Sequence, residues 1–363
     1  MDKYIETALP LAEINDAAIR EKAGKPGHPA NLHMWWGRSP VASSLAALSA
    51  AVSDFSEDTA AADMAQIAQV ASDDPDALEA FCRKWGEGAK APTVWDPFAG
   101  FGSIPIAAQK LGLKVAANDL NPVAAMLTRA AVDIPSRFAG RPPVHPGEAG
   151  RAAYSDAQGL AEDVQFYGEW LENQALKRLA DVYPQTKAGQ IPFAWLWVRT
   201  VKCPNPACNC KIPLGSSFIL QKTKTAQVWV EPIEQDGEIQ FTIHDGECPA
   251  EKESNKIGAG GAKFRCPVCG EITTDEYIKK MGLAHELGAE MMAVVTNTGG
   301  QKIFLAPDDA QKSAAAVQRP EDAPPGSIPS NAHWFSPPGY GITDYADLFT
   351  PRQLLMLTIF SDL

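Results

Sequence analysis

The sequence lacks long apolar runs. Across its 363 residues, no stretch reaches the roughly 18 apolar residues that a membrane helix needs. The opening residues, MDKYIETALPLAEIND, also lack the apolar core and cleavage site of a signal peptide. With 21% charged and 45% hydrophobic residues, the composition is that of an ordered soluble chain. These features predict a cytoplasmic protein that does not associate with membranes.

The chain also lacks an excess of basic residues. Its formal net charge is −12, whereas proteins that bind nucleic acid usually carry a basic face. The overall charge therefore argues against a large nucleic-acid footprint. It still allows a local basic patch, or DNA contacts that a partner makes.

Cysteine is scarce outside one segment, because six of the seven cysteines lie between Cys203 and Cys269. In a cytosolic chain, clustered cysteines indicate a metal before disulfides. Cys203 and Cys208 form one knuckle, and Cys266 and Cys269 form a second. Four thiolates satisfy tetrahedral Zn²⁺ and leave no position open for water, so we expect a structural zinc ion. The alternative is a set of reduced structural cysteines without metal. The residues outside both knuckles are Cys210, Cys248 and His244.

The pattern along the chain predicts four regions. Residues 1–90 are an N-terminal helical region, and residues 91–197 combine an α/β part with a helical connection. Residues 198–275 hold the cysteines and hairpin strands, and residues 276–363 form a C-terminal α/β segment. Thr350 and Pro351 are typical of a helix start, as N-cap and first-turn proline. The apolar run that follows stops at Leu363 without a cap, so we expect this segment to be truncated.

A glycine turn joins a predicted strand to a predicted helix. The strand TVWD ends at Asp96, and Gly100 and Gly102 let the backbone turn without a Cβ in the way. A helix over 104–111 follows, with Ser103 as its expected N-cap and Gly112 as its stop. The next strand, 113–119, ends in an acid, and Asn121 opens a further helix. This order is that of the first half of a doubly wound sheet.

The residues of this turn indicate S-adenosylmethionine as the cofactor. A dinucleotide site would have a third glycine where Pro105 stands, and no Lys-Ser/Thr pair follows to bind phosphates. Asp119 is placed to accept hydrogen bonds from ribose hydroxyls. The alternative is an ordinary strand-to-helix turn. The predicted cofactor-binding residues are Asp96, Pro97, Phe98, Gly100, Gly102, Asp119 and Asn121.

The loop HPANLHMWWGRSP, here called the WW loop, gathers aromatic and basic side chains. Trp35 and Trp36, with Arg38 nearby, could stack on a nucleobase or on the adenine of the cofactor. Equally, both tryptophans could anchor the loop in the core. His28 and His33 are expected to be hydrogen-bonded loop residues and not catalysts.

Several segments together resemble one bacterial and archaeal family, the zinc-ribbon-containing adenine-specific DNA methylases that begin with a domain of unknown function. These segments are the opening ETALPLAEIN with LHMWWGRSP, WDPFAGFGSIPIAAQKLG with NDLNPVA, FAGRPP, AWLWVRTVKCPNPAC and DLFTPRQLL. The resemblance implies a class I, Rossmann-like methyltransferase sheet, incomplete here, with an inserted zinc ribbon. It also implies methyl transfer to a DNA base amine, at adenine N6, in restriction-modification or phage defence.

The chain departs from that family's pattern in one respect. Amino-methyltransferases carry a D/N/S-P-P-Y/F/W tetrapeptide, which accepts the hydrogens of the amine and stacks on the flipped base. This chain contains no such tetrapeptide; Ser336-Pro337-Pro338-Gly339-Tyr340 comes nearest. We therefore predict no catalytic residues here. The expected partners are DNA and a C-terminal methyltransferase half or second subunit.

Two other functions are compatible with the same residues. One is a binding module in which the zinc ribbon and the WW loop bind DNA or a partner protein and the cofactor fold is vestigial. The other is an RNA methyltransferase, since such enzymes use similar glycine loops.

Overall fold

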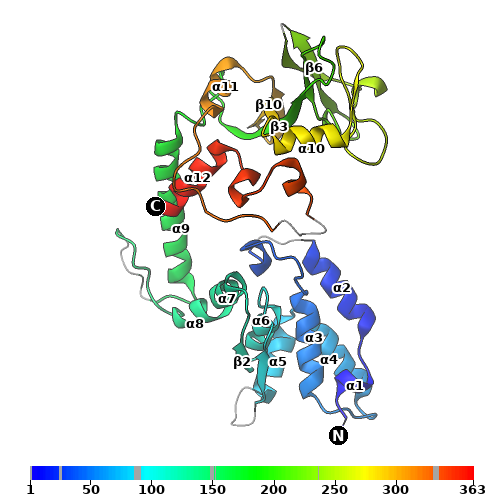
Figure 1. Ribbon diagram of the computed structural model, residues 1–363. Helices are drawn as coiled ribbons and strands as arrows, with labels where there is room; N and C mark the ends of the chain where they lie inside the picture. Colours follow the sequence, from blue (N-terminus) through cyan, green and yellow to red (C-terminus); the bar gives the residue numbers. More distant parts are fainter. Residues whose placement is uncertain are drawn as a thin grey trace. The chain divides into compact units, whose positions relative to one another are not determined.

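The structure is a computed structural model that describes residues 2–23, 27–85, 91–147, 151, 153–235, 237–329 and 335–363. The protein is a mixed α/β chain with several small sheets (Figure 1). It divides into two units, Met1–Tyr167 and Gly168–Leu363, and the boundary falls within one long helix. Among the described residues, no helix is both long and apolar enough to cross a bilayer.

The first unit begins with helices that pack through small and branched apolar side chains. They are α1 (Tyr4–Thr7), α2 (Leu11–Lys22), α3 (Val41–Val52), α4 (Ala60–Ala71) and α5 (Pro75–Trp85). The alanine-rich run after Pro40 predicts a helix from Val41 to about Val52, and α3 has these bounds. The spacing of Ile5, Leu9 and Ile14 predicts a helical pattern that continues across Pro10. The structure instead has two helices, α1 and α2, because proline has no N–H to donate to the preceding turn.

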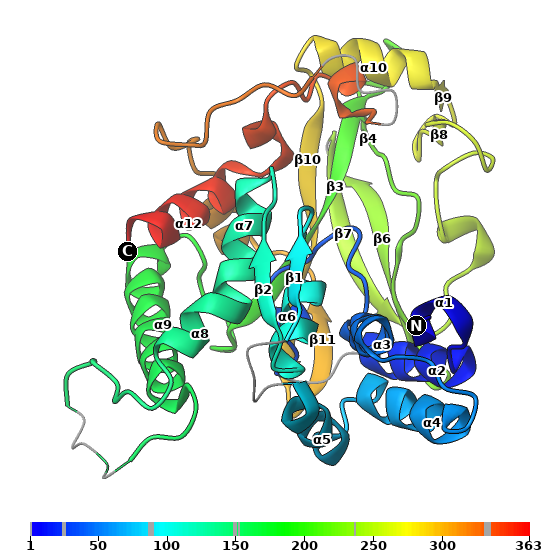
Figure 2. The same cartoon turned by 90° about the horizontal axis from the view of Figure 1, so that it is seen from below.

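The predicted strand–turn–helix–strand order is present in the first unit. β1 (Thr93–Asp96) pairs in parallel with β2 (Lys114–Ala117), and α6 (Ser103–Lys110) connects them. Figure 2 shows the two strands side by side next to α6. Three short helical segments follow β2: α7 (Pro122–Thr128), a π-helical turn (Arg129–Asp133) and α8 (Ile134–Arg137). The sheet has two strands among the described residues, so the chain shows one parallel unit and not a complete doubly wound sheet.

Helix α6 ends before Gly112, as the sequence predicts, but its N-cap is a different residue from the one predicted. Gly112 adopts a φ of +67° after the last turn, as expected for a glycine that stops a helix. Ser103, however, is not the N-cap: it is the first helical residue, and Gly102 occupies the cap position. The Ser103 hydroxyl donates instead to the carbonyl of Ser39, at 2.6 Å. It therefore fixes the WW loop and does not cap its own helix.

The second unit is built on longer strands. β3 (Pro192–Lys202) lies between β4 (Lys211–Pro213) and β10 (Gly288–Thr298), and β11 (Gln301–Leu305) completes this antiparallel sheet. A second sheet contains β5 (Ile219–Lys222), β6 (Gln227–Gln235) and β7 (Glu238–Asp245), and β8 (Phe264–Arg265) pairs with β9 (Ile272–Thr273). The helices are α9 (Gln158–Leu179, which spans the boundary), α10 (Asp275–Leu283), α11 (Asp309–Ala315) and α12 (Pro351–Asp362).

Helix α12 starts as predicted and is held within the second unit. The Thr350 hydroxyl accepts the N–H of Gln353, and the Gln353 side chain accepts the N–H of Thr350. Arg352 is buried, and its guanidinium lies 4.6 Å from the ring centroids of both Tyr183 and Trp195. Because these rings belong to other segments of the unit, this cation–π contact joins α12 to the chain after α9 and to β3.

Candidate functional site

Two groups of side chains carry the chemistry predicted from the sequence. The glycine turn and the WW loop lie in the first unit, and the cysteine cluster lies in the second.

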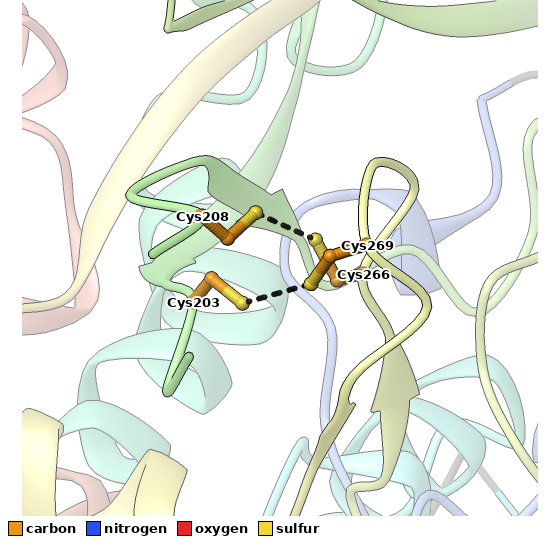
Figure 3. Close-up of side chains that lie close together, drawn as sticks. All are labelled: Cys203, Cys208, Cys266 and Cys269. Atoms are coloured by element: carbon orange, nitrogen blue, oxygen red, sulfur yellow. Dashed lines mark hydrogen bonds between the residues drawn. The ribbon is translucent and has the colours of Figure 1, made fainter. Parts of the chain in front are cut away.

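The four predicted cysteines come together at one point. The Sγ atoms of Cys203, Cys208, Cys266 and Cys269 all lie within 4.8 Å of one another. Figure 3 shows Cys203 facing Cys269 and Cys208 facing Cys266, with Sγ–Sγ distances of 3.6 and 3.7 Å. With Zn–S bonds of about 2.3 Å, tetrahedral geometry places neighbouring sulfurs about 3.8 Å apart. The cluster therefore has the dimensions of a four-thiolate metal site.

Tight hairpins present both knuckles. The first follows β3 and returns into β4, and the N–H of Cys203 donates to the carbonyl of Cys210 at 2.9 Å. The second connects β8 to β9, and the N–H of Cys266 donates to the carbonyl of Glu271 at 2.8 Å. Gly270 has a φ of +76° in this turn, a conformation that favours glycine. Backbone pairing on both sides thus aims two thiols from each hairpin at the same point.

The environment of the thiols differs within the cluster. Burial raises the pKa of Cys203, whereas the backbone N–H of Glu271 lowers the pKa of Cys269 to about 7. The cysteines outside the cluster point elsewhere: Cys210 donates to the carbonyl of Lys211, and Cys248 donates to the carbonyl of Pro249. His244 instead lies with its Nε2 atom 3.0 Å from a carboxylate oxygen of Glu231. The four-cysteine set expected from the knuckle spacing is the set that the fold assembles.

In the first unit, the glycine turn has the backbone conformation that its sequence predicts. Gly100 and Gly102 have φ values of +52° and +92°, in the left-handed region. Asp96 is buried at the end of β1, and its Oδ1 atom accepts the N–H of Phe98 at 3.1 Å. The side chain of Phe98 is 85% exposed. Pro97 is half-buried between Asp96 and Phe98.

Asp119 closes the turn from the second strand. One of its oxygens accepts the N–H of Gly100 and the other accepts the N–H of Asn121, each at 2.8 Å. Both hydrogen bonds lower the pKa of Asp119, and the one from the N–H of Asn121 has the larger effect. The ionised carboxylate therefore stabilises the folded state at every pH above the ordinary pKa of aspartate. This stabilisation is lost as the pH falls through the lowered pKa of Asp119. Asn121 itself caps α7, because its side-chain oxygen accepts the N–H of Val123.

A pocket of about 320 Å³ adjoins the Asp119 side of the turn. This volume falls in the range of small-ligand sites, roughly 300–1,000 Å³. Its walls come from β2, α6 and the helical segments after β2, and its polar lining includes Asn118, Asp119, Thr128 and Arg129.

The structure also brings the WW loop against the glycine turn, a contact that the sequence did not predict. A methyl group at Gly100 would lie 3.0 Å from the Nε1 atom of Trp35. Trp35 is half-buried against the core of the first unit, and Trp36 meets it edge-on with ring centroids 5.0 Å apart. Trp36 itself is 86% exposed. Trp35 thus has the position of a core anchor, whereas Trp36 faces solvent.

Glu21 fixes the other end of this loop. Its Oε1 atom accepts from Arg38 at 3.1 Å, and its Oε2 atom accepts the N–H of Ala42 in the first turn of α3 at 2.9 Å. His28 lies 3.4 Å from the same carboxylate. Arg38 is therefore engaged in holding the loop, and no pattern in the sequence had indicated Glu21 as its partner.

Ser336–Tyr340, the segment whose sequence comes nearest to the catalytic tetrapeptide, is held by contacts within the second unit. Pro337–Tyr340 forms a 3₁₀ turn, and the Tyr340 hydroxyl donates to Asp275 of α10 at 2.6 Å. The side chain of Lys279 lies over the same ring, 5.5 Å from its centroid. Tyr340 is thereby fixed to α10.

Comparison with known proteins gives one match. Residues 8–73 match the model of a family described as "Protein of unknown function (DUF1156)". This stretch contains α2, α3, the WW loop and Glu21, and it ends before the glycine turn. Neither the curated proteins nor the solved structures gave a match.

Proposed function

We propose that this chain binds S-adenosylmethionine at its glycine turn and is the cofactor-binding part of a DNA amino-methyltransferase. The methyl acceptor is adenine N6, and the setting is restriction-modification or phage defence, as the family resemblance implies. The catalytic tetrapeptide comes from outside these 363 residues.

The observation that carries the proposal is the closure of the glycine turn by Asp119. Each carboxylate oxygen already accepts one backbone N–H, and each has a second lone pair left for a ribose hydroxyl. The lowered pKa keeps this group ionised, and therefore an acceptor, at neutral pH. The adjoining pocket has room for a small ligand, and the turn lacks the lysine that phosphate binding would use. A nucleoside without phosphate, such as S-adenosylmethionine, suits both features.

The cysteine cluster would hold Zn²⁺ in a structural role. Four sulfur ligands fill a tetrahedral site, so the ion would cross-link the two hairpins and leave no position for a reacting water. The resulting ribbon would stiffen the second unit.

The partner half would extend the two-stranded sheet of β1 and β2. Parallel sheets are normally covered on both faces. Here the described sheet has two strands, and Trp95 of β1 is 69% exposed. We propose that strands of the catalytic half extend this two-stranded sheet and that its side chains cover Trp95.

Isothermal titration with S-adenosylmethionine tests the cofactor site. We expect wild-type protein to bind and Asp119→Ala to lose at least tenfold in affinity, since a hydrogen bond to a charged group contributes about 1.5–3 kcal/mol. Asp163→Ala is the matched control, because Asp163 also accepts two backbone N–H groups within the first unit, those of Val144 and His145. Absence of heat with folded wild-type protein would refute the proposal.

A methylation assay tests whether catalysis requires the partner half. We expect no transfer of labelled methyl groups from S-adenosylmethionine to DNA above background with this chain alone, because the amine has no acceptor for its hydrogens. Robust transfer to DNA would show that the chain has its own catalytic groups. Transfer to RNA but not to DNA, with the partner half present, would favour an RNA methyltransferase.

A further inference from the structure

Trp36 is a large aromatic side chain held in solvent beside the glycine turn. We propose that it is a stacking platform for a nucleobase of the DNA strand that reaches this turn. This inference rests on the proposed function and names a contact on the acceptor side of the same site. It concerns Trp36 and not Trp35, whose indole is packed against Gly100 and the core.

Several contacts hold the loop that carries Trp36. Its ring meets Trp35 at an interplanar angle of 62°, and Trp35 rests on the glycine turn. Just after the two tryptophans, the loop is held by the Arg38–Glu21 ion pair and by the bond from Ser103 to the carbonyl of Ser39. Because the loop is already held, stacking of a base has to order the Trp36 side chain but not the loop.

Charge in this segment favours a nucleic-acid strand over an apolar protein surface. Among the described residues 20–23 and 27–38, the basic side chains are Arg20, Lys22 and Arg38, and the one acidic side chain, Glu21, pairs with Arg38, in a chain of net charge −12. A polar pocket of about 210 Å³ lies against the loop, and Lys22, His33, Met34 and Trp35 are among its lining residues. An aromatic platform next to cationic groups is the arrangement by which proteins bind single-stranded nucleic acid or an extruded base.

Trp36 lies outside the pocket that is expected to hold the cofactor. The pocket beside Asp119 is lined by residues of the turn, β2 and the following helices, and by none of the WW loop. The pocket against the WW loop has no residue of the turn in its lining. Trp36 is in the lining of neither pocket, so a base stacked on its exposed ring would lie outside the pocket proposed for the cofactor.

Fluorescence anisotropy of a labelled single-stranded oligodeoxynucleotide tests the inference with the full, zinc-loaded chain at low salt. We expect Trp36→Ala to weaken binding about tenfold, which corresponds to the loss of one base stack. Trp36→Phe should retain most of the affinity. Trp170→Ala is the matched control, because Trp170 is a partly exposed tryptophan in the other unit.

Titration of S-adenosylmethionine into the same variants separates the outcomes. The inference predicts that Trp36→Ala binds the cofactor like wild type. A Trp36→Ala variant that binds DNA like wild type, or a wild-type chain that does not bind DNA, overturns the inference and leaves the cofactor proposal intact. A loss of cofactor affinity without a loss of DNA affinity would assign Trp36 to the adenine instead. An RNA oligonucleotide of the same sequence shows which nucleic acid the platform prefers.

Discussion

Cys266→Ser is expected to lose bound zinc and to unfold much of the second unit. Cys266 is buried in the core of that unit, so its thiol serves both the metal site and the packing. Structural zinc contributes an apparent 10–16 kcal/mol in zinc-finger peptides at about neutral pH, which exceeds the stability of most domains. Elemental analysis should find one zinc ion per wild-type chain and almost none in the variant, and thermal unfolding should lose its cooperative transition for this unit.

Cys248→Ser is the control for the zinc prediction. Cys248 is buried to a similar degree and lies outside the four-cysteine cluster, so this variant should keep its metal. Because Cys266→Ser could fail to express, chelator titration of the wild-type chain provides a second measurement, in which unfolding should follow metal release. Equal zinc content in wild type and Cys266→Ser would contradict the assignment.

Gly102→Ala is expected to destabilise the first unit and to distort the glycine turn. At a φ of +92°, any side chain costs about 1–2 kcal/mol in backbone strain. The new methyl group would also lie 2.9 Å from the Oγ1 atom of Thr128, which itself donates to the carbonyl of Gly100 at 3.3 Å. Thermal unfolding should therefore shift to lower temperature, and the distorted turn should lose measurable binding of S-adenosylmethionine.

Gly147→Ala separates strain from crowding. Gly147 lies in the same unit at a φ of +97°, and a Cβ there would meet nothing within 4 Å. It should lose stability from strain alone and keep cofactor binding. Adding Thr128→Ala to Gly102→Ala should restore part of the lost stability by removing the crowded oxygen. Equal destabilisation by the two glycine substitutions would show that Thr128 does not constrain the turn.

Local sequence signals predicted the short elements well. The strand TVWD, the helix over 41–52, the stop at Gly112 and the start at Thr350 all depend on neighbouring residues: a glycine, a proline or a capping hydroxyl. The longest strands, β3 and β10, were missed. β10 contains alanine, methionine and glutamate, which favour helix in isolation, and its partner β3 is distant in sequence. Pairing between such distant segments outweighs local propensity, and a single sequence does not display it.

The sequence by itself determined two sets of groups: the acids and glycines of the turn at 96–119, and the four cysteines of two knuckles. Residue type and short spacing are enough for both, because backbone turns and thiol chemistry are local. Only the tertiary structure decided that Trp35 packs on Gly100 while Trp36 stays exposed, and that Glu21 holds Arg38. It also decided that the two knuckles meet despite the strands between them. These are contacts between residues far apart in the chain, and side-chain packing, unlike a turn, leaves no short-range pattern in the sequence.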